Sequence, residues 1–286
     1  MVANNPQSVD RSYKFMYKLL ELKFHRYFYQ EGDNIEFIET EIPDTGQRKD
    51  IVVKVDGKTI QITEFMAKAL DDEKLRDIFD YHDSSRTDPS YDDFNVRTGV
   101  ISIANPNHGK NKVEIDENIT FHVTPIFTKR NDGWKVLSSL VYKTVTQEEL
   151  SDREAIDLLI LPDMHIKLPI KVLMCLIIVL IGKVNIQDED FKKKIVLCEL
   201  KVLSRFFKDR ELSEMIEMLQ TQTKNPEVAR IIAKYGQGFD VIYFDGKADG
   251  KLDTAKNLLA EKVDEEIISK CTGISIEELK KLKRKL

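Results

Sequence analysis

The chain has 286 residues, of which 33% are charged, and its formal net charge is -5. This length accommodates one large domain or two smaller ones, each with a core of its own. The acidic balance excludes a protein that binds nucleic acid phosphates over its whole surface, and it leaves room for a local basic patch.

Membrane insertion and disulfide bonding are not expected. The N-terminal segment lacks the apolar core of a signal peptide, which predicts a cytoplasmic protein. The apolar run 172–181 is shorter than the ~20 residues of a membrane span, so it predicts a buried core helix. Cys175, Cys198 and Cys271 lie among apolar residues without a CxxC or Cys/His cluster, and we interpret them as buried, reduced thiols.

The first part of the chain alternates helical and extended patterns. Residues 12–30 place apolar side chains at a helical period, and residues 35–42 alternate as in a strand. Residues 48–68 indicate two strands joined at Asp56-Gly57. Three acids at 71–73 then mark the start of a predicted helix, where negative side chains interact favourably with the helix dipole.

Further extended segments follow this helix. Residues 100–104 form a short apolar strand, so the strand–helix–strand order predicts a parallel, right-handed crossover. Residues 119–127 and 134–142 indicate two more extended segments around a turn. Residues 1–145 therefore predict one α/β layer domain.

The rest of the chain changes to helical periodicity. Residues 146–235 form a predicted helical region. Residues 236–286 begin with a Gly/Asp-rich linker and continue into a tail with three short helical patterns. The helical patterns before the linker are at 148–161, 168–181, 188–207, 211–219 and 226–233.

Two acids mark the predicted hairpin, Asp50 at its start and Glu64 near its end. A two-residue turn at Asp56-Gly57 would direct these side chains to opposite faces of the sheet. A three-residue loop such as 55–57, or a β-bulge near Asp50, would place them on one face. Carboxylate oxygens are the ligands that Mg²⁺ and Mn²⁺ prefer, so the second arrangement would suit a metal site. The alternative is that Glu64 is a strand-end carboxylate paired with Lys68 or an arginine.

The order of helix, strand, two-acid hairpin, helix and strand resembles the core of the PD-(D/E)XK nuclease superfamily. Through segments 35–55, 80–86, 100–109, 158–164 and 251–279, the chain is similar over nearly its full length to the Rpn-like family of recombination-promoting nucleases and transposase-related proteins. The resemblance implies an α/β fold with a PD-(D/E)XK nuclease-like mixed sheet flanked by helices, followed by an all-helical C-terminal region.

The resemblance also implies a set of site residues. Asp50 and Glu64 would bind Mg²⁺ or Mn²⁺ together with the carbonyl of Phe65, and a basic residue two positions after the second acid would assist the attacking water. That position is Met66, which offers neither charge nor a strong hydrogen bond. Lys68 returns to the same side of the strand, so it is the candidate for the catalytic role.

Other candidates carry weaker signals. Lys49 and Lys54 are further candidates for a displaced base. Glu21 could supply an acid from the first helix, but a solvated helical glutamate is the better explanation. Arg86 could contact a phosphate, but a cation at a helix C-terminus is favoured by the dipole in any case. The segment 105–110 indicates a turn first and a substrate loop second.

The tail resembles a helix-turn-helix. Ser275 begins a capping box and Gly273 ends the preceding helix. Because Glu277 and Glu278 at the start of the last helix would repel phosphates, a helical hairpin that pairs with a second protomer is the alternative. The candidate nucleic-acid-binding residues of the tail are Lys280, Lys281, Lys283 and Arg284.

The resemblance implies a metal-dependent DNA endonuclease of the recombination- and transposase-associated type, which hydrolyses phosphodiester bonds. The alternative is a catalytically inactive nuclease-fold protein that acts as a DNA- or protein-binding module, and Met66 favours it. Whether the chain is an enzyme is open at this point. The expected partners are DNA and a second copy of the chain, with no membrane partner.

Overall fold

The structure, a computed structural model, describes residues 6–38, 50–117 and 119–224. These residues belong to a compact unit that spans Met1–Ala229. The helical pattern at 226–233, Lys49, Cys271 and the whole predicted tail, with Lys280, Lys281, Lys283 and Arg284, lie outside the described residues.

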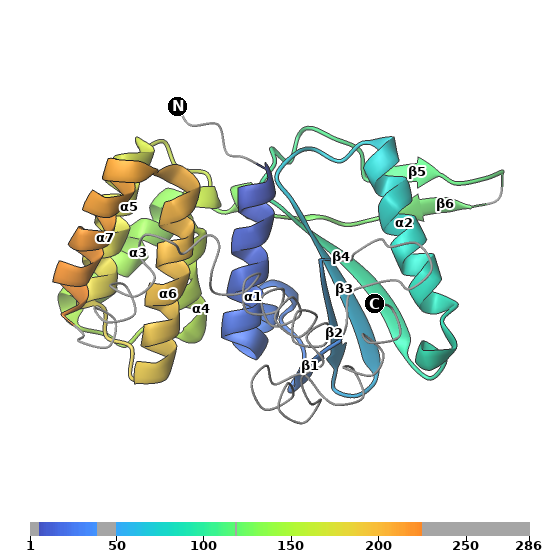
Figure 1. The fold of residues 1–286 in the computed structure, drawn as a ribbon, viewed down its shortest axis with the longest axis horizontal. Coiled ribbons are helices and arrows are strands. Elements are labelled where there is room, and N and C mark those ends of the chain that lie inside the picture. The colour runs from blue at the N-terminus through green and yellow to red at the C-terminus, as the bar shows by residue number, and fades with distance from the viewer. Residues whose placement is uncertain (1–5, 39–49, 118, 225–286) are drawn as a thin grey trace, which may run out of the picture. The chain divides into compact units, whose positions relative to one another are not determined.

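A five-stranded mixed sheet lies beside helices α1 and α2 (Figure 1). Its strand order is β1-β2-β3-β4-β7; β1, β2 and β3 pair antiparallel, whereas β4 pairs parallel with both β3 and β7. The expected mixed sheet and the parallel pairing of β3 with β4 are therefore confirmed. The elements are α1 (Pro6–Tyr29), β1 (Ile35–Phe37), β2 (Ile51–Val55), β3 (Thr59–Met66), α2 (Asp72–Arg86), β4 (Asn95–Ser102) and β7 (Ile126–Phe127).

The β2–β3 turn contains three residues. Val55 pairs with Thr59, and Asp56, Gly57 and Lys58 form the loop between them. Asp56 and Gly57 have φ angles of 50° and 66°, the left-handed region that Gly adopts without strain. The loop is thus odd in length, which is one of the two alternatives that would allow the metal site. It begins one residue later than the predicted loop 55–57.

Both faces of the hairpin are buried. Val52, Ile60 and Ile62 form one apolar cluster. On the other face, the ring of Phe65 packs 5.4 Å from the ring of Tyr13 in α1. A strand covered on both sides carries apolar residues at successive positions, which explains why β2 shows no clean alternation.

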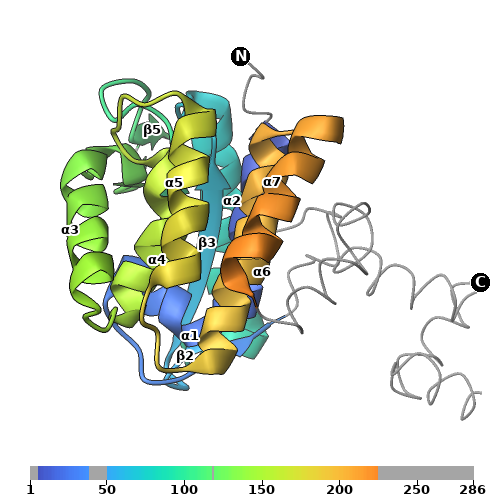
Figure 2. The same cartoon turned by 90° about the vertical axis from the view of Figure 1, so that its left-hand side faces the viewer.

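A helical bundle packs against the far side of α1 (Figures 1 and 2). Helix α1 contacts β3 on one side and α4 and α6 on the other, so it is shared by the sheet and the bundle. The helices of the bundle are α3 (Gly133–Thr146), α4 (Asp152–Ile160), α5 (Ile170–Lys183), α6 (Glu189–Phe206) and α7 (Asp209–Thr223).

A buried ion pair joins α1 to the bundle. Arg205 of α6 donates two hydrogen bonds to the Asp163 carboxylate, at 2.9 and 2.7 Å, and both side chains are 1% exposed. The hydroxyl of Tyr13 donates to the same carboxylate at 3.0 Å. Since a buried charge is tolerated only when it is paired, these three side chains fix how α1 lies on α6.

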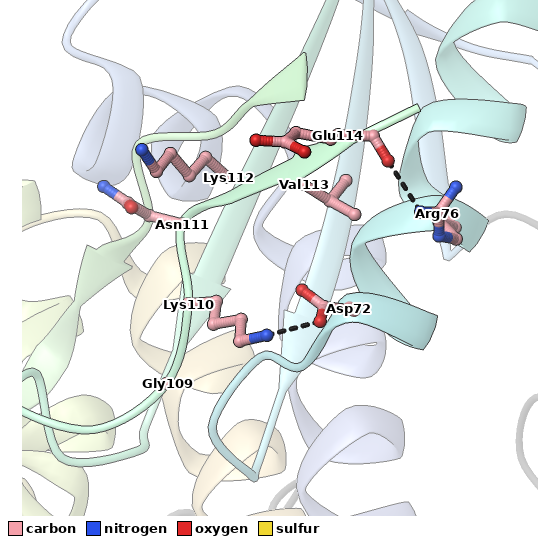
Figure 3. A pocket seen from close by; sticks show the side chains of 8 residues that line it. All are labelled: Asp72, Arg76, Gly109, Lys110, Asn111, Lys112, Val113 and Glu114. Atoms are coloured by element: carbon pink, nitrogen blue, oxygen red, sulfur yellow. Dashed lines mark hydrogen bonds and ion pairs between the residues drawn. The ribbon is translucent and has the colours of Figure 1, made fainter. Parts of the chain in front are cut away.

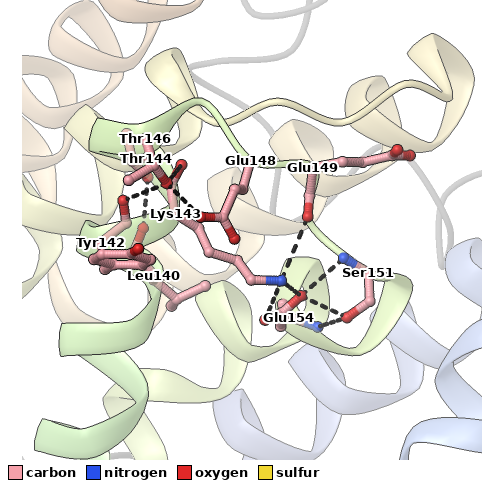
Figure 4. A network of polar contacts seen from close by, with 9 residues as sticks. All are labelled: Leu140, Tyr142, Lys143, Thr144, Thr146, Glu148, Glu149, Ser151 and Glu154. Carbon is pink, nitrogen blue, oxygen red and sulfur yellow. Dashed lines mark hydrogen bonds and ion pairs between the residues drawn. The ribbon is translucent and has the colours of Figure 1, made fainter.

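The turn from α3 to α4 is held by a polar network (Figure 4). Ser151 and Glu154 form a reciprocal capping box at the start of α4, with the Ser151 N–H donating to Glu154 Oε2 at 2.9 Å. Lys143, near the end of α3, donates to the same oxygen at 2.9 Å. These contacts are structural, because each group in them satisfies the terminus of a helix.

The prediction that 134–142 is extended is wrong, because this segment lies in α3. The Asp132 carboxylate accepts hydrogen bonds from two backbone N–H groups in the first turn, at 3.0 and 3.2 Å. Leu137, Leu140 and Thr144 are buried at helical spacing. The extended segment expected at 119–127 divides into β7 and the short strand β6 (Thr120–His122), which pairs with β5 (Lys112–Glu114).

The apolar run 172–181 lies in α5, and one side of this helix is buried as expected, whereas Val172 and Leu176 are exposed. In the part of the chain that the structure describes, no helix combines the length and hydropathy needed to cross a bilayer. Cys198 is a buried free thiol, as predicted. Cys175 is only half-buried, because it borders an apolar hollow between α5 and α7.

Candidate active site

Asp50 and Glu64 face each other across the mouth of the hairpin. Ile51 pairs with Thr63, so the next residues outward are Asp50 and Glu64. The Asp50 N–H donates to Glu64 Oε1 at 3.2 Å, and the Phe65 N–H donates to Asp50 Oδ2 at 2.8 Å. The three-residue turn therefore brings both carboxylates to the same end of the sheet.

Helix α1 adds a third carboxylate and a cation. The Lys14 ammonium lies 2.6 Å from Asp50 Oδ1 and 3.0 Å from Asp10 Oδ2. The other oxygen of Asp10 is buried and has no hydrogen-bond partner among the described residues. Lys14 thus holds two acids together, and Asp10 keeps a free acceptor at the site.

Helix α2 supplies a second cation. Asp71 caps the helix by accepting from the Lys74 N–H at 2.9 Å, which fixes Lys74 in the first turn. The Lys74 ammonium lies 3.3 Å from Glu64 Oε2 and 5.5 Å from the centre of the Tyr81 ring. Met66, at the position of the expected lysine, instead packs against the apolar cluster under α2.

Burial makes this cluster sensitive to charge. Glu64 is 2% exposed, and burial, followed by repulsion from Asp50, raises the pKa of Glu64 to about 7. Burial and the same repulsion raise the pKa of Asp10 to about 6. Lys74 opposes both shifts, and Lys14 also opposes that of Asp10. Any additional cation among these carboxylates would favour their ionised forms.

The donor set suits a hard cation. Asp10, Asp50 and Glu64 provide carboxylate oxygens, and Phe65, the residue after Glu64, has a backbone carbonyl; these are the ligand types that Mg²⁺ and Mn²⁺ take. Within the described ranges, no group of three or more His, Cys, Asp or Glu side chains is arranged closely enough to hold a metal ion. In this arrangement the ammonium of Lys14 lies between Asp10 and Asp50 and neutralises them.

The structure separates some predicted residues from this site. Lys68 is exposed beyond the end of β3, and Lys54 lies over the ring of Phe94, 4.7 Å from its centre. Glu21 occupies a kink in α1, with φ 49°, and lines a hollow next to the start of α6. The helical acid of the site is therefore Asp10 rather than Glu21.

Arg86 lies at the far end of α2 from Lys74. Its side chain is 69% exposed and approaches Asp83 at 3.8 Å. Twelve residues of helix separate the two cations, a rise of about 18 Å. A phosphate bound at Arg86 would thus lie well away from the carboxylates.

Sequence reasoning missed Asp10, Lys14 and Lys74. The helix was expected to begin at residue 12, whereas α1 begins at Pro6 and includes Asp10. The i,i+4 spacing of Asp10 and Lys14 was a usable signal once the helix is extended. Lys74 had no local signal, since its role depends on how α2 lies over β3.

Comparison of the chain with protein-family models, with curated proteins and with solved structures finds no match in any of the three.

Proposed function

We propose that this chain is a metal-dependent DNA endonuclease with a PD-(D/E)XK-like core, and that its reaction is phosphodiester hydrolysis. The observation that carries the proposal is the pairing of Asp50 with Glu64 at the sheet end, produced by the odd turn. Two carboxylates on adjacent strands, with cations from two different helices, form a centre suited to phosphate chemistry.

The proposed roles of the site side chains follow from their charges. Asp50 and Glu64 would hold Mg²⁺ or Mn²⁺, with Asp10 and the Phe65 carbonyl as further oxygen donors. The bound cation would supply Lewis-acid polarisation of the scissile phosphate and an activated water. Glu64 must first lose its proton, which the raised pKa delays to near-neutral pH.

Lys74 provides the positive charge that Met66 cannot. Burial lowers the pKa of Lys74, but the Glu64 carboxylate and other nearby acidic groups raise it by more. The net shift is upward, so the ammonium stays protonated. A protonated ammonium beside the carboxylates stabilises negative charge that develops on the phosphate. Lys68 remains the sequence-based candidate for the same role, and the two lysines can be distinguished by mutation.

A second candidate function is a catalytically inactive module that binds DNA or protein. The observation that favours it is the pairing of Lys14 with Asp50 and of Lys74 with Glu64, which already neutralises both carboxylates without a metal. In this alternative the cluster stabilises the sheet end, and Met66 reflects the loss of catalysis.

A plasmid-nicking assay with Mg²⁺ or Mn²⁺ separates the two functions. We expect nicking by the wild type and its loss in Asp50→Ala and Glu64→Ala, because each variant removes an anionic ligand. Glu217→Ala, an exposed acid of α7, is the matched control and should nick as the wild type does. Equal background cleavage in all four proteins would reject the nuclease and leave the binding module.

Parallel variants assign the catalytic cation. We expect Lys74→Met to reduce nicking at least tenfold and to move the pH profile upward, because Glu64 loses the charge that opposes its pKa shift. Lys68→Met should leave both unchanged. The reverse result would return the catalytic role to Lys68.

The DNA-binding residues predicted from sequence form part of the same proposal. Arg86 and the tail residues Lys280, Lys281, Lys283 and Arg284 would contact the backbone. Removing residues 280–286 should weaken DNA binding and flatten its salt dependence, since each lost phosphate contact lowers the slope by about 0.9. Unchanged affinity after the truncation would exclude the tail from the interface.

A further inference from the structure

A polar hollow of about 570 Å³ lies between the first turns of α2 and the segment that leads into β5 (Figure 3). Three cations surround it, and the proposed catalytic chemistry uses none of them. The polar side chains around the hollow belong to Asp72, Arg76, Lys110, Asn111, Lys112 and Glu114.

The walls of the hollow are held in place by backbone contacts. The Lys110 N–H donates to the Leu70 carbonyl at 2.8 Å, and Arg76 donates to the Glu114 carbonyl at 2.6 Å. Gly109 has φ +95°, and a Cβ at this position would lie only 2.9 Å from the Leu70 nitrogen. The chain therefore needs glycine here to approach α2 so closely, and the hollow is a fixed feature.

Packing behind the hollow adds to its rigidity. Val113 is buried in the same apolar cluster as Leu75 of α2. Phe121 on the neighbouring strand β6 packs edge-on against Phe79, with ring centres 5.4 Å apart. The β5–β6 hairpin is thus anchored to α2, and its polar residues are presented from a rigid element.

The hollow has three cations, Arg76, Lys110 and Lys112, against two carboxylates, Asp72 and Glu114, so its net charge is +1. Lys110 is paired with Asp72, whereas the structure gives Lys112 no acidic partner among the described residues. Arg76 uses its Nη2 group for a backbone carbonyl and keeps its other N–H donors for a ligand. Arg76 and Lys112 can therefore bind one anion together, and Arg matches the geometry of a phosphate.

The hollow and the carboxylate cluster flank the first turns of α2 on different sides. Asp72 and Arg76 line the hollow, and Lys74 between them contacts Glu64. At 3.6 residues per turn, Lys74 projects from roughly the opposite side of the helix to Asp72 and Arg76. A strand that crosses the N-terminal end of α2 would therefore reach both the hollow and the carboxylates.

We propose that this hollow binds a phosphate of the nucleic acid strand where the strand crosses the start of α2, with Arg76 and Lys112 as its ligands. The inference rests on the proposed nuclease function and adds to it a second phosphate site, which holds the strand beside Asp50 and Glu64. Asn111 offers an amide to the same strand.

DNA binding by charge-neutral variants tests this site. A short fluorescent duplex is titrated with the wild type, Lys112→Gln, Arg76→Gln and the double variant over a range of salt concentrations, with nicking measured in parallel. Lys167→Gln, an exposed lysine before α5, is the control. We expect the double variant to bind about tenfold more weakly, with a salt slope lower by about 1.8 for two lost contacts.

The single variant Lys112→Gln controls for a folding defect in the double variant. Lys112 is exposed, whereas Arg76 also holds β5 in place. The salt slope of this single variant should fall by about 0.9 while its thermal unfolding matches that of the wild type. If the double variant binds and nicks as the wild type does, the phosphate site is rejected and the nuclease stands. Variant-sensitive binding without nicking rejects the nuclease and keeps the phosphate site. A wild type that does not bind DNA rejects the phosphate site.

Discussion

Glu199 offers a stability prediction that the structure makes quantitative. This residue of α6 is fully buried, and neither of its carboxylate oxygens has a hydrogen-bond partner among the described residues. Burial raises its pKa from 4.5 to about 8, and the attraction of Arg205 only partly opposes the shift. At neutral pH the folded protein therefore holds Glu199 protonated, whereas the unfolded chain ionises it.

The sign and size of the effect follow from linkage. A group whose pKa is raised by folding binds more protons in the folded state, so its contribution to stability falls as pH rises above the unfolded value. Between pH 4.5 and pH 7 this loss is about 3 kcal/mol. Replacing Glu199 by Met, which has a similar shape and no charge, removes the loss.

We expect Glu199→Met to raise the free energy of unfolding by about 3 kcal/mol at pH 7 and to change it little near pH 4.5. Urea unfolding of both proteins at several pH values measures this difference. Comparing the two proteins at each pH cancels the titration of Asp10 and Glu64. Glu217→Gln, an exposed acid, should show no pH-dependent difference. A gain that is the same at every pH, or a less stable variant at pH 7, would refute the reasoning.

Three further outcomes follow from named contacts. Arg205→Met should destabilise the fold by about 3–5 kcal/mol in urea, because Asp163 stays buried without its partner, and recovery on adding Asp163→Asn would identify the stranded charge as the cause. The nicking rate should increase as pH passes through the pKa of Glu64, about 7, and a flat pH–rate profile would exclude Glu64 as a ligand that must ionise. Gly99→Ala should lower stability by about 1–3 kcal/mol in thermal unfolding, because the added Cβ would overlap the Tyr29 ring; an unchanged melting temperature would show that the ring can move.

Local signals in the sequence were enough for the hairpin and for most helices. The two acids, the Asp56-Gly57 turn and the helix that starts after Asp71 all rest on contacts within a few residues. The length of the turn, in contrast, does not depend on such local contacts. The Asp56 carboxylate accepts from the N–H groups of Asp33 and Asn34, each at 2.8 Å, and these residues are distant in sequence. Two- and three-residue turns thus stayed equally compatible with the local pattern.

The prediction of a strand at 134–142 was wrong for a related reason. Its aromatic and β-branched residues favour a strand, yet Trp134, Val141 and Tyr142 lie on the exposed side of α3. The Asp132 cap and the burial of the opposite side outweigh that preference. Lys74 illustrates the same limit at the candidate site, because a lysine in a first helical turn has no signal that it will contact Glu64.

The odd length of the β2–β3 turn has a genetic consequence. Deleting one codon, such as that of Lys58, would leave two residues to reverse the chain, which a hairpin also accepts. Ile51, Val52 and Val53 are all buried, so rotating the strand would exchange one apolar side chain for another and leave the core filled. Asp50, however, would turn away from Glu64. A single in-frame deletion could thus remove the carboxylate pair and leave the sheet intact, so that a descendant protein keeps the fold and loses the site.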